Sequence, residues 1–199
     1  ALFLGYVKRI LPEKMMIISV RTASIGYALP GTVIAVGVII PFAWFDRKID
    51  SLMSSYFGIS SGLILSGTIF AIMFAYVVRF LAVSLQTVES GLEKIKPSMD
   101  DAARSLGYRP REALVKVHIP LLKSSSLTAL MIVFVDVMKE LPATLILRPF
   151  DFNTLAVRTF ELASDERLAD SSTSALAIVL AGLLPVIYLS QTISKTRLK

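Results

Sequence analysis

The stretch that decides the fold is Asp101-Ala102-Ala103-Arg104-Ser105-Leu106-Gly107, which is followed after nine residues by Val117-His118-Ile119-Pro120. Ser98 can cap a helix whose first turn holds Asp100 and Asp101, where the positive end of the helix dipole favours carboxylates. Gly107 adopts a positive φ at little cost and can end that helix, and Pro110 suits the first turn of another. The stretch therefore predicts two short helices separated by a sharp turn.

Hydrophobic segments on both sides of this stretch indicate a membrane protein. Hydrophobic residues make up 54% of the 199 residues and the mean hydropathy is +0.68, which is high for a soluble domain. Core helices of a soluble protein could explain one long apolar segment more easily than four. Four segments approach the roughly 20 residues that cross about 30 Å of hydrocarbon: 25–45, 62–83, 126–147 and 173–193.

The distribution of cations predicts the orientation of these spans. If a loop at about 84–123 lies in the cytoplasm, most Lys and Arg residues fall on that side, whereas the opposite loops at 46–59 and 148–172 hold few. The formal net charge of +6 is then a signal of topology. A nucleic-acid surface would need these cations on one folded face, and no nucleic-acid recognition motif accompanies them. We therefore expect no nucleic-acid partner.

The start of the chain resembles the cytoplasmic end of a span, because an apolar run from Ala1 to Val7 is followed by Lys8-Arg9. We interpret the chain as a fragment of one transmembrane domain, 1–199, with about four complete spans and the end of one more. No cysteine is present, which excludes disulfides and thiolate metal sites within this fragment.

The segment 148–172 is expected to fold outside the membrane as more than a connector. Thr154 can cap one short helix there, and Ser164 can cap a second that begins at Asp165 and leads into the last span. Its acidic side chains could meet a basic partner or could simply be solvated, and the sequence leaves both readings open.

No catalytic motif is present in the chain. The phosphate-binding loop G-x-x-x-x-G-K-[ST] is absent, so ATP hydrolysis must belong to a partner. His118 is the single histidine, and without a nearby Cys or carboxylate pair we expect a surface residue and no metal site. The phenols of Tyr27, Tyr76 and Tyr188 are expected to anchor at interfaces or pack.

The stretch from Asp101 to Pro120 resembles the EAA motif of ABC importer permeases. In that family the pattern reads Glu-Ala-Ala, three residues, Gly, nine residues, Ile, any residue, Leu, Pro, and it forms the cytoplasmic loop that docks onto the ATP-hydrolysing subunit. The spacing here fits without a gap, with Asp101 in place of Glu, Val117 in place of Ile and Ile119 in place of Leu. An ordinary surface helix-turn-helix would share the glycine and the proline but not the full spacing.

Four other segments resemble the ferric-iron branch of these permeases: Lys139-Glu140-Leu141-Pro142-Ala143-Thr144, Leu147-Arg148-Pro149-Phe150, the run from Phe160 to Leu168, and Gly26-Tyr27-Ala28-Leu29-Pro30-Gly31. Members of that branch usually carry two homologous halves, and this chain would correspond to the carboxy-terminal half. Thiamine, sulfate, polyamine and phosphonate systems share the same loop. Ferric iron is therefore the favoured cargo, with those solutes as alternatives.

The resemblance implies an all-α membrane protein with the type I importer permease core, a MetI-like helical bundle, located as a multi-pass protein in the bacterial inner (plasma) membrane. The implied partners are a dimer of ABC ATPase subunits, an extracytoplasmic solute-binding protein, a second permease half or subunit, and membrane lipid. ATP and Mg would be used by the ATPase, with no cofactor bound by this chain. The implied coupling residues are Asp101, Ala102, Ala103, Arg104, Gly107, Val117, Ile119 and Pro120.

Three charged residues, Asp136, Lys139 and Glu140, fall inside the segment 126–147, where an isolated charge costs roughly 2.5–3.5 kcal/mol. Residues three and four apart share a helix face, so Lys139 can neutralise Asp136 while Glu140 lies beside the same patch, before a kink at Pro142. The cluster could be a self-paired group at the water interface, or it could line the translocation path or its gate.

Two other classes of function are kept as alternatives. An ion-coupled secondary transporter would use charges at mid-membrane and need no docking loop. A membrane-anchored assembly or signalling protein would move no cargo.

Overall fold

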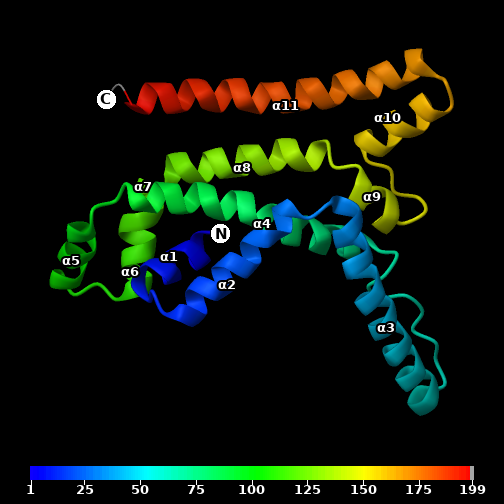
Figure 1. The fold of residues 1–199 in the computed structure, drawn as a ribbon, viewed down its shortest axis with the longest axis horizontal. Coiled ribbons are helices and arrows are strands. Elements are labelled where there is room, and N and C mark those ends of the chain that lie inside the picture. Colours follow the sequence, from blue (N-terminus) through cyan, green and yellow to red (C-terminus); the bar gives the residue numbers. More distant parts are fainter. Residues whose placement is uncertain (198–199) are drawn as a thin grey trace. The chain divides into compact units, whose positions relative to one another are not determined.

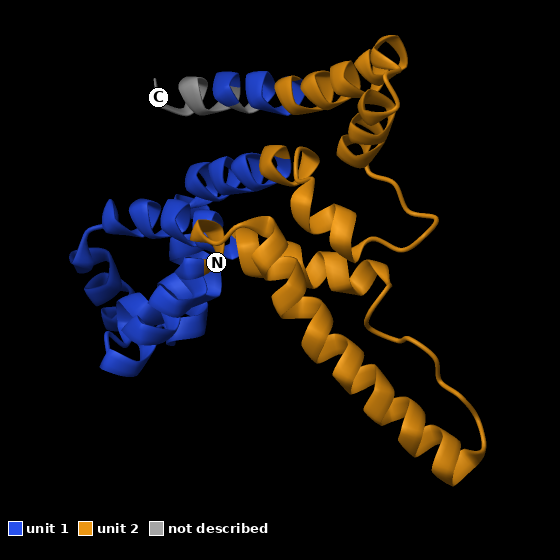
Figure 2. Cartoon of the chain, turned by 45° about the vertical axis from the view of Figure 1, so that its right-hand side comes forward, with its two compact units in different colours: residues 1–25, 81–134, 184–199 blue, residues 26–80, 135–183 orange. Residues whose placement is uncertain are grey.

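The computed structural model describes residues 1–197, in which the regular elements are helices and no strand occurs. Figure 1 shows these helices from α1 to α11. The chain divides into two compact units, which Figure 2 shows in separate colours. Unit 1 comprises residues 1–25, 81–134 and those from 184 onward, and unit 2 comprises residues 26–80 and 135–183. The expected all-α class is confirmed.

Unit 1 contains most of the short helices. They are α1 (Leu2–Ile10), α2 (Lys14–Ser24), α5 (Pro97–Ser105), α6 (Pro110–Ala113) and α7 (Ile119–Leu121), with a π-helical turn, η2 (Leu114–His118), between the last two. The long helices α4 (Ile69–Glu93), α8 (Lys123–Met138) and α11 (Leu168–Arg197) each contribute a part.

The core of unit 1 joins α1, α4 and the turn before α8 through the buried side chains of Tyr6, Val88, Leu92 and Leu122. Gly91 lets α4 approach Leu122 and the start of α8 closely, because a Cβ at that position would lie 2.5 Å from the hydroxyl oxygen of Ser125 and 2.9 Å from Cδ2 of Leu122. The docking loop predicted from the sequence is thus flanked by a packed hydrophobic core.

Unit 2 contains α3 (Gly31–Phe57), α9 (Pro142–Leu147) and α10 (Leu155–Ser164), together with the first half of α4 and most of α11. Its core forms where α3, α4 and α9 meet, from eight buried side chains: Ile34, Ala35, Val38, Ala71, Ile72, Ala75, Ala143 and Leu147. The 3-10 turn η1 (Ile25–Ala28) leads into α3. Its Gly26 sits so close to α4 that a Cβ would lie 2.0 Å from the carbonyl oxygen of Val78, which only glycine avoids.

Two carboxylates on α3, one helical turn apart, hold the loop at 58–68. Asp46 is 1% exposed, and its oxygens accept hydrogen bonds from the backbone N–H groups of residues 64, 65 and 66. Asp50 accepts hydrogen bonds from the hydroxyl of Ser60 at 2.7 Å and the N–H of Ser61 at 2.8 Å. The expectation of a loop at 46–59 is therefore wrong, because α3 continues to Phe57.

The helices long and apolar enough to cross a membrane are Ile69–Glu93 and Leu168–Tyr188, and the described residues give up to four spans if each of two bent helix pairs counts as one. The segment 62–83 becomes helical only at the start of α4. The segment 126–147 is interrupted after α8 and resumes at Pro142, whose ring removes an N–H and disfavours a continuous helix. The segment 25–45 begins in η1, and 173–193 lies within α11.

Helix capping differs from the sequence expectation at two serines. Ser98 lies inside α5, because the helix begins at Pro97, whose fixed φ suits a first turn. Ser164 ends α10 and does not cap the last helix, which starts further along the chain. Thr154 caps α10 as expected, with its hydroxyl oxygen accepting a hydrogen bond from the N–H of Val157.

Candidate functional site

The turn between α5 and α6 has the geometry that the sequence predicted. Gly107 follows α5 with a φ of 78°, in the left-handed region. The N–H of Tyr108 bonds to the carbonyl of Ala103 at 3.0 Å, and that of Gly107 bonds to the carbonyl of Arg104 at 2.9 Å, which is the Schellman pattern of a helix end. Nothing lies within 4 Å of a Cβ built at residue 107. Backbone conformation, and not space, therefore favours glycine there.

The second helix of the loop begins at Pro110, as predicted, and is broken into short pieces. The carboxylate of Glu112 accepts a hydrogen bond from the N–H of Arg109 at 2.9 Å and so caps α6. The chain then widens into the π-helical turn η2, which ends two residues before Pro120. Because Pro120 has no N–H to donate to an earlier carbonyl, the helical ladder is interrupted at this point.

Most of the predicted coupling residues lie on the solvent side of this loop. Asp101 and Arg104 form an ion pair with each other, and their side chains remain 63% and 76% exposed. Ala102, Gly107, Ile119 and Pro120 are also exposed, Val117 is half-buried, and Ala103 is buried. The loop thus offers an exposed face that rests on a buried alanine.

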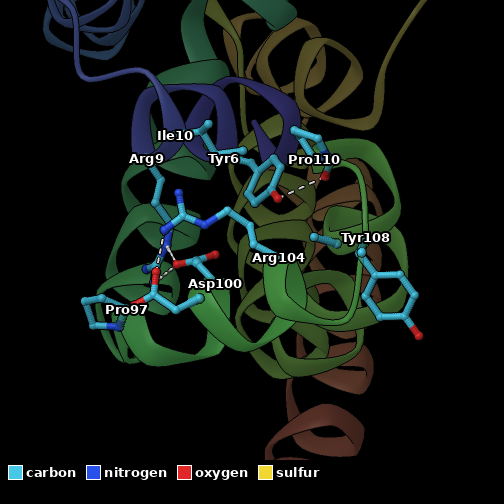
Figure 3. Close-up of a pocket in the computed structure, with 11 residues that line it drawn as sticks. Tyr6, Arg9, Ile10, Pro97, Asp100, Arg104, Tyr108 and Pro110 are labelled. Carbon is cyan, nitrogen blue, oxygen red and sulfur yellow. Dashed lines mark hydrogen bonds and ion pairs between the residues drawn. The ribbon is translucent and has the colours of Figure 1, made fainter.

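Asp100, one residue before the motif, lies at the centre of a cluster that the sequence analysis missed. Its Oδ2 accepts hydrogen bonds from Arg9 Nε at 3.0 Å and Nη2 at 2.7 Å (Figure 3). Its Oδ1 lies 2.7 Å from Nε2 of His118. Arg9 also donates hydrogen bonds to the carbonyls of Leu92 and Ile95 at the end of α4. No local pattern could have linked Arg9 to Asp100, because 91 positions separate them.

His118 is buried, so the expectation of a surface position was wrong. Its side chain is 0% exposed, and its ring packs on Tyr6 with the ring centroids 4.8 Å apart. Tyr6 donates its hydroxyl hydrogen to the carbonyl of Pro110 at 2.9 Å (Figure 3). The part of the chain that the structure describes contains no group of three or more His, Cys, Asp or Glu able to hold a metal ion. The contacts of the His118 ring with Tyr6 and Asp100 join the predicted docking loop to the core of unit 1.

A hollow of about 490 Å³ opens beside this cluster, between α1, α5 and α6. Tyr6, Arg9, Asp100, Gly107 and Tyr108 are among the residues that line it (Figure 3). Within the described residues, α1 and α5 share no broad packing surface. The contact between these two helices therefore depends strongly on the pair of Arg9 with Asp100.

A second group of charges is buried in unit 2, where Glu140 pairs with Arg79 of α4. Arg79 Nε lies 3.2 Å from Glu140 Oε2, and the two side chains are 19% and 6% exposed. Glu140 Oε1 also accepts a hydrogen bond from the N–H of Ala143 at the start of α9. Gly31 lies against the pair, since a Cβ there would stand 2.6 Å from Glu140 Oε1 and 2.7 Å from Arg79 Nη1. The ion pair thus joins α3, α4 and α9.

Asp136 and Lys139 form the local pair that helix spacing predicted, at 2.8 Å between Nζ and Oδ1. Asp136 is buried and accepts a hydrogen bond from the hydroxyl of Tyr27 at 3.4 Å, whereas the Lys139 side chain is 65% exposed. Glu140 takes its ion-pair partner from α4 and not from this local pair, because α8 ends at Met138 before the chain reaches Glu140. The signal that could have found its partner is Arg79, the single charge in the apolar segment 62–83.

Comparison with known proteins identifies the family to which this architecture belongs. Residues 2–199 match the family described as Binding-protein-dependent transport system inner membrane component. The chain belongs to this family. Its MetI-like permease fold and its membrane character agree with the helices described above.

The names of two relatives state a transported solute. The chain is 30% identical over 165 residues to an Fe(3+)-transport system permease protein of Haemophilus influenzae, an alignment that covers 83% of this chain and 29% of the relative. It is 28% identical over 156 residues to a putative 2-aminoethylphosphonate transport system permease protein of Salmonella typhimurium, covering 78% of this chain and 52% of that protein. The chain therefore spans only part of the length of either relative.

Proposed function

We propose that this chain forms part of the translocation path of an ATP-driven ABC importer and couples it to a separate ATPase. The observation that carries the proposal is the exposed face of α5 ending in the left-handed turn at Gly107, in a chain of the inner membrane component family. The proposed partners are an ATPase dimer that uses ATP and Mg, a solute-binding protein outside the inner membrane, a second permease half or subunit, and lipid. This chain itself would bind no cofactor.

Coupling requires that chemistry in one subunit bias a two-state element in another through a stiff contact. In the proposed cycle the ATPase dimer closes on ATP, and Asp101, Arg104 and the other exposed residues of α5 move with the surface they contact. The motion then reaches the spans through the helices packed beneath the loop. The opening of the path changes from one side of the membrane to the other.

Ferric iron is the cargo that we favour, and it is supported by the permease of Haemophilus influenzae. A phosphonate is the second candidate, supported by the permease of Salmonella typhimurium. The charges of these two ion pairs do not favour a cation over an anion, because Arg79 and Lys139 balance Asp136 and Glu140. Selection between the two cargoes would then rest with the solute-binding protein.

The charges of unit 2 are the proposed gate of the translocation path. Buried ion pairs in a membrane protein are costly to form and are commonly functional. The pair of Arg79 with Glu140 links α4 to the start of α9, and Arg79 also donates a hydrogen bond to the carbonyl of Leu29 just before α3. Asp136 is linked to the turn before α3 through the hydroxyl of Tyr27. Opening the pair would release these elements from one another.

Transport by reconstituted complexes tests the proposal. The complete permease would be placed in proteoliposomes with its ATPase and its solute-binding protein, and uptake of ferric iron and of 2-aminoethylphosphonate would be measured with and without ATP. We expect ATP-dependent uptake of iron. Uptake that continues without ATP would favour a secondary transporter, and an absence of uptake for any solute would favour an assembly or signalling role.

The turn at Gly107 provides a sharper test of coupling. A β-branched residue in the left-handed region is strained, by roughly 1–2 kcal/mol per residue for non-glycine residues, so Gly107→Val should lower cargo uptake and the stimulation of the ATPase. Gly107→Asn is the matched control, because asparagine tolerates this conformation and the site has free space. Both variants should insert normally into the membrane. Uptake at the wild-type rate by Gly107→Val would remove the turn from the mechanism.

A further inference from the structure

We propose that Asp100 is the positioning residue that makes the docking helix α5 move together with α1, α4 and the second helix of the loop. The inference rests on the proposed coupling function and adds a residue outside the motif. Three separate segments meet at this one carboxylate. Arg9 comes from α1, His118 comes from η2, and Asp100 itself lies in the first turn of α5.

The covalent connections of α5 are poorly suited to transmit a push. Residues 94–96 connect it to α4 in a turn, and the segment around Gly107 connects it to α6. Neither connection is a continuous helix, so each can bend. Because α5 shares no broad packing surface with α1 in the described residues, contacts between side chains must supply the stiffness.

Arg9 extends the cluster to the end of a membrane helix. Its guanidinium bonds to Asp100 through Nε and Nη2 and to the carbonyls of Leu92 and Ile95, which close the C-terminal end of α4. A cation at a helix C-terminus is favourable, and a planar fork can hold a carboxylate and carbonyls at once. Displacement of Asp100 therefore acts directly on the end of α4.

His118 extends the cluster in the other direction. Its Nε2 donates to Oδ1 of Asp100, since an ionised carboxylate can only accept. The ring is fully buried against Tyr6, whose hydroxyl reaches the carbonyl of Pro110. A motion of α5 thus reaches α6 and η2 through these side chains as well as through the turn at Gly107.

The neighbouring Asp101 shows why residue 100 carries this role. Among the described residues the ion-pair partner of Asp101 is Arg104, three residues along the same helix, and both side chains are largely exposed. Such a pair braces no second element and is weakened by solvent. The side chains of Asp100 and Arg9 are only 27% and 18% exposed, and removal of one would leave the other shielded and without its partner.

Cargo moved per ATP hydrolysed tests the inference in the complete transport complex. We expect Asp100→Asn to lower this ratio on the order of 2- to 30-fold, the range of coupling changes for residues within such networks, while the ATPase still co-purifies with the permease. Arg9→Lys keeps the charge but loses the fork, so it should lower the ratio in the same direction. Asp101→Asn should instead weaken ATPase binding.

Glu93→Gln is the matched control, because it removes the same charge from an exposed side chain near the cluster. Among the described residues Glu93 has no ion pair, so the ratio should stay at the wild-type value. A wild-type ratio in both Asp100→Asn and Arg9→Lys would overturn the inference. If the wild-type complex itself shows no ATP-dependent uptake, the proposed function fails instead.

A distance measurement tests, without measuring transport, whether Asp100 holds α5 in place against the end of α4. The chain contains no native cysteine, so spin labels can be placed at Lys94 and Ser105, which are both exposed and lie just after α4 and at the end of α5. A narrow distance distribution is expected in the otherwise unchanged protein and in Glu93→Gln. Asp100→Asn should broaden it. An unchanged distribution in Asp100→Asn would show that α5 is held by other contacts.

Discussion

Glu140 shows how this chain accommodates a charge in an apolar segment. The carboxylate is 6% exposed, and the structure surrounds it with Arg79 and the N–H of Ala143. Gly31 leaves room for the pair, because any side chain there would start within 2.7 Å of Arg79 Nη1 and closer still to Glu140 Oε1. Replacing one partner of a buried pair leaves an uncompensated charge, whereas replacing both can be neutral.

A double-mutant cycle on this pair distinguishes a structural role from a gate. Glu140→Gln and Arg79→Gln should each lower the free energy of unfolding by about 3–5 kcal/mol, and the double variant should recover much of the loss. Thermal unfolding in detergent measures these changes. A gate predicts that cargo uptake stays low in the stable double variant, while docking-dependent ATPase activity and membrane insertion persist.

Asp136→Asn supplies the comparison for the same gate. Its partner Lys139 is largely exposed, so this substitution should cost less stability than Glu140→Gln. The gate hypothesis still predicts reduced uptake. Wild-type uptake in Asp136→Asn and in the double variant would leave only a structural pair.

At the scale of elements, local chemistry was predictable and distant pairing was not. Gly107 and Pro110 signal their turn through properties of single residues, and the structure has the turn where the sequence predicted it. The start of α4 at Ile69 could not be read in this way, because the preceding loop is held by Asp46 on another helix. His118 was misjudged for the same reason, since its partner Tyr6 lies far away in the chain.

The loop at 58–68 gives a prediction at this scale. The Asp46 carboxylate acts as an acceptor in its hydrogen bonds to this loop. Asp46→Asn would place an amide NH₂ against these N–H groups and leave at least one of them unpaired. A buried group left unsatisfied costs about 1–3 kcal/mol, and the free energy of opening the loop should fall by that amount. Hydrogen exchange at Leu65 and Ser66 measures the change. The half-buried Asp50 provides a milder comparison, and equal protection in Asp46→Asn and the unchanged protein would contradict the prediction.

For the whole molecule, composition predicted the membrane class and the motif predicted the family, because both are properties of the sequence alone. The cargo was not predictable, since two relatives named for different solutes align with 83% and 78% of this chain. Sidedness depends on the distribution of cations and stays a prediction. It also bears on both proposals, because docking and cargo entry must occur on opposite sides.

Single cysteines test this sidedness on a chain that has none of its own. Ser98 in α5 and Ser164 at the end of α10 are both exposed, so a membrane-impermeant thiol reagent can reach either from the side on which it lies. Because the Lys and Arg residues gather around the docking loop, Ser98→Cys should react only from the cytoplasm and Ser164→Cys only from outside. A third site, Lys199, falls outside the described residues and is expected on the cytoplasmic side. Ala35→Cys is the control and should react from neither side, because this position is 0% exposed. Labelling of Ser98→Cys from outside would reverse the predicted orientation and exclude α5 as the contact with a cytoplasmic ATPase.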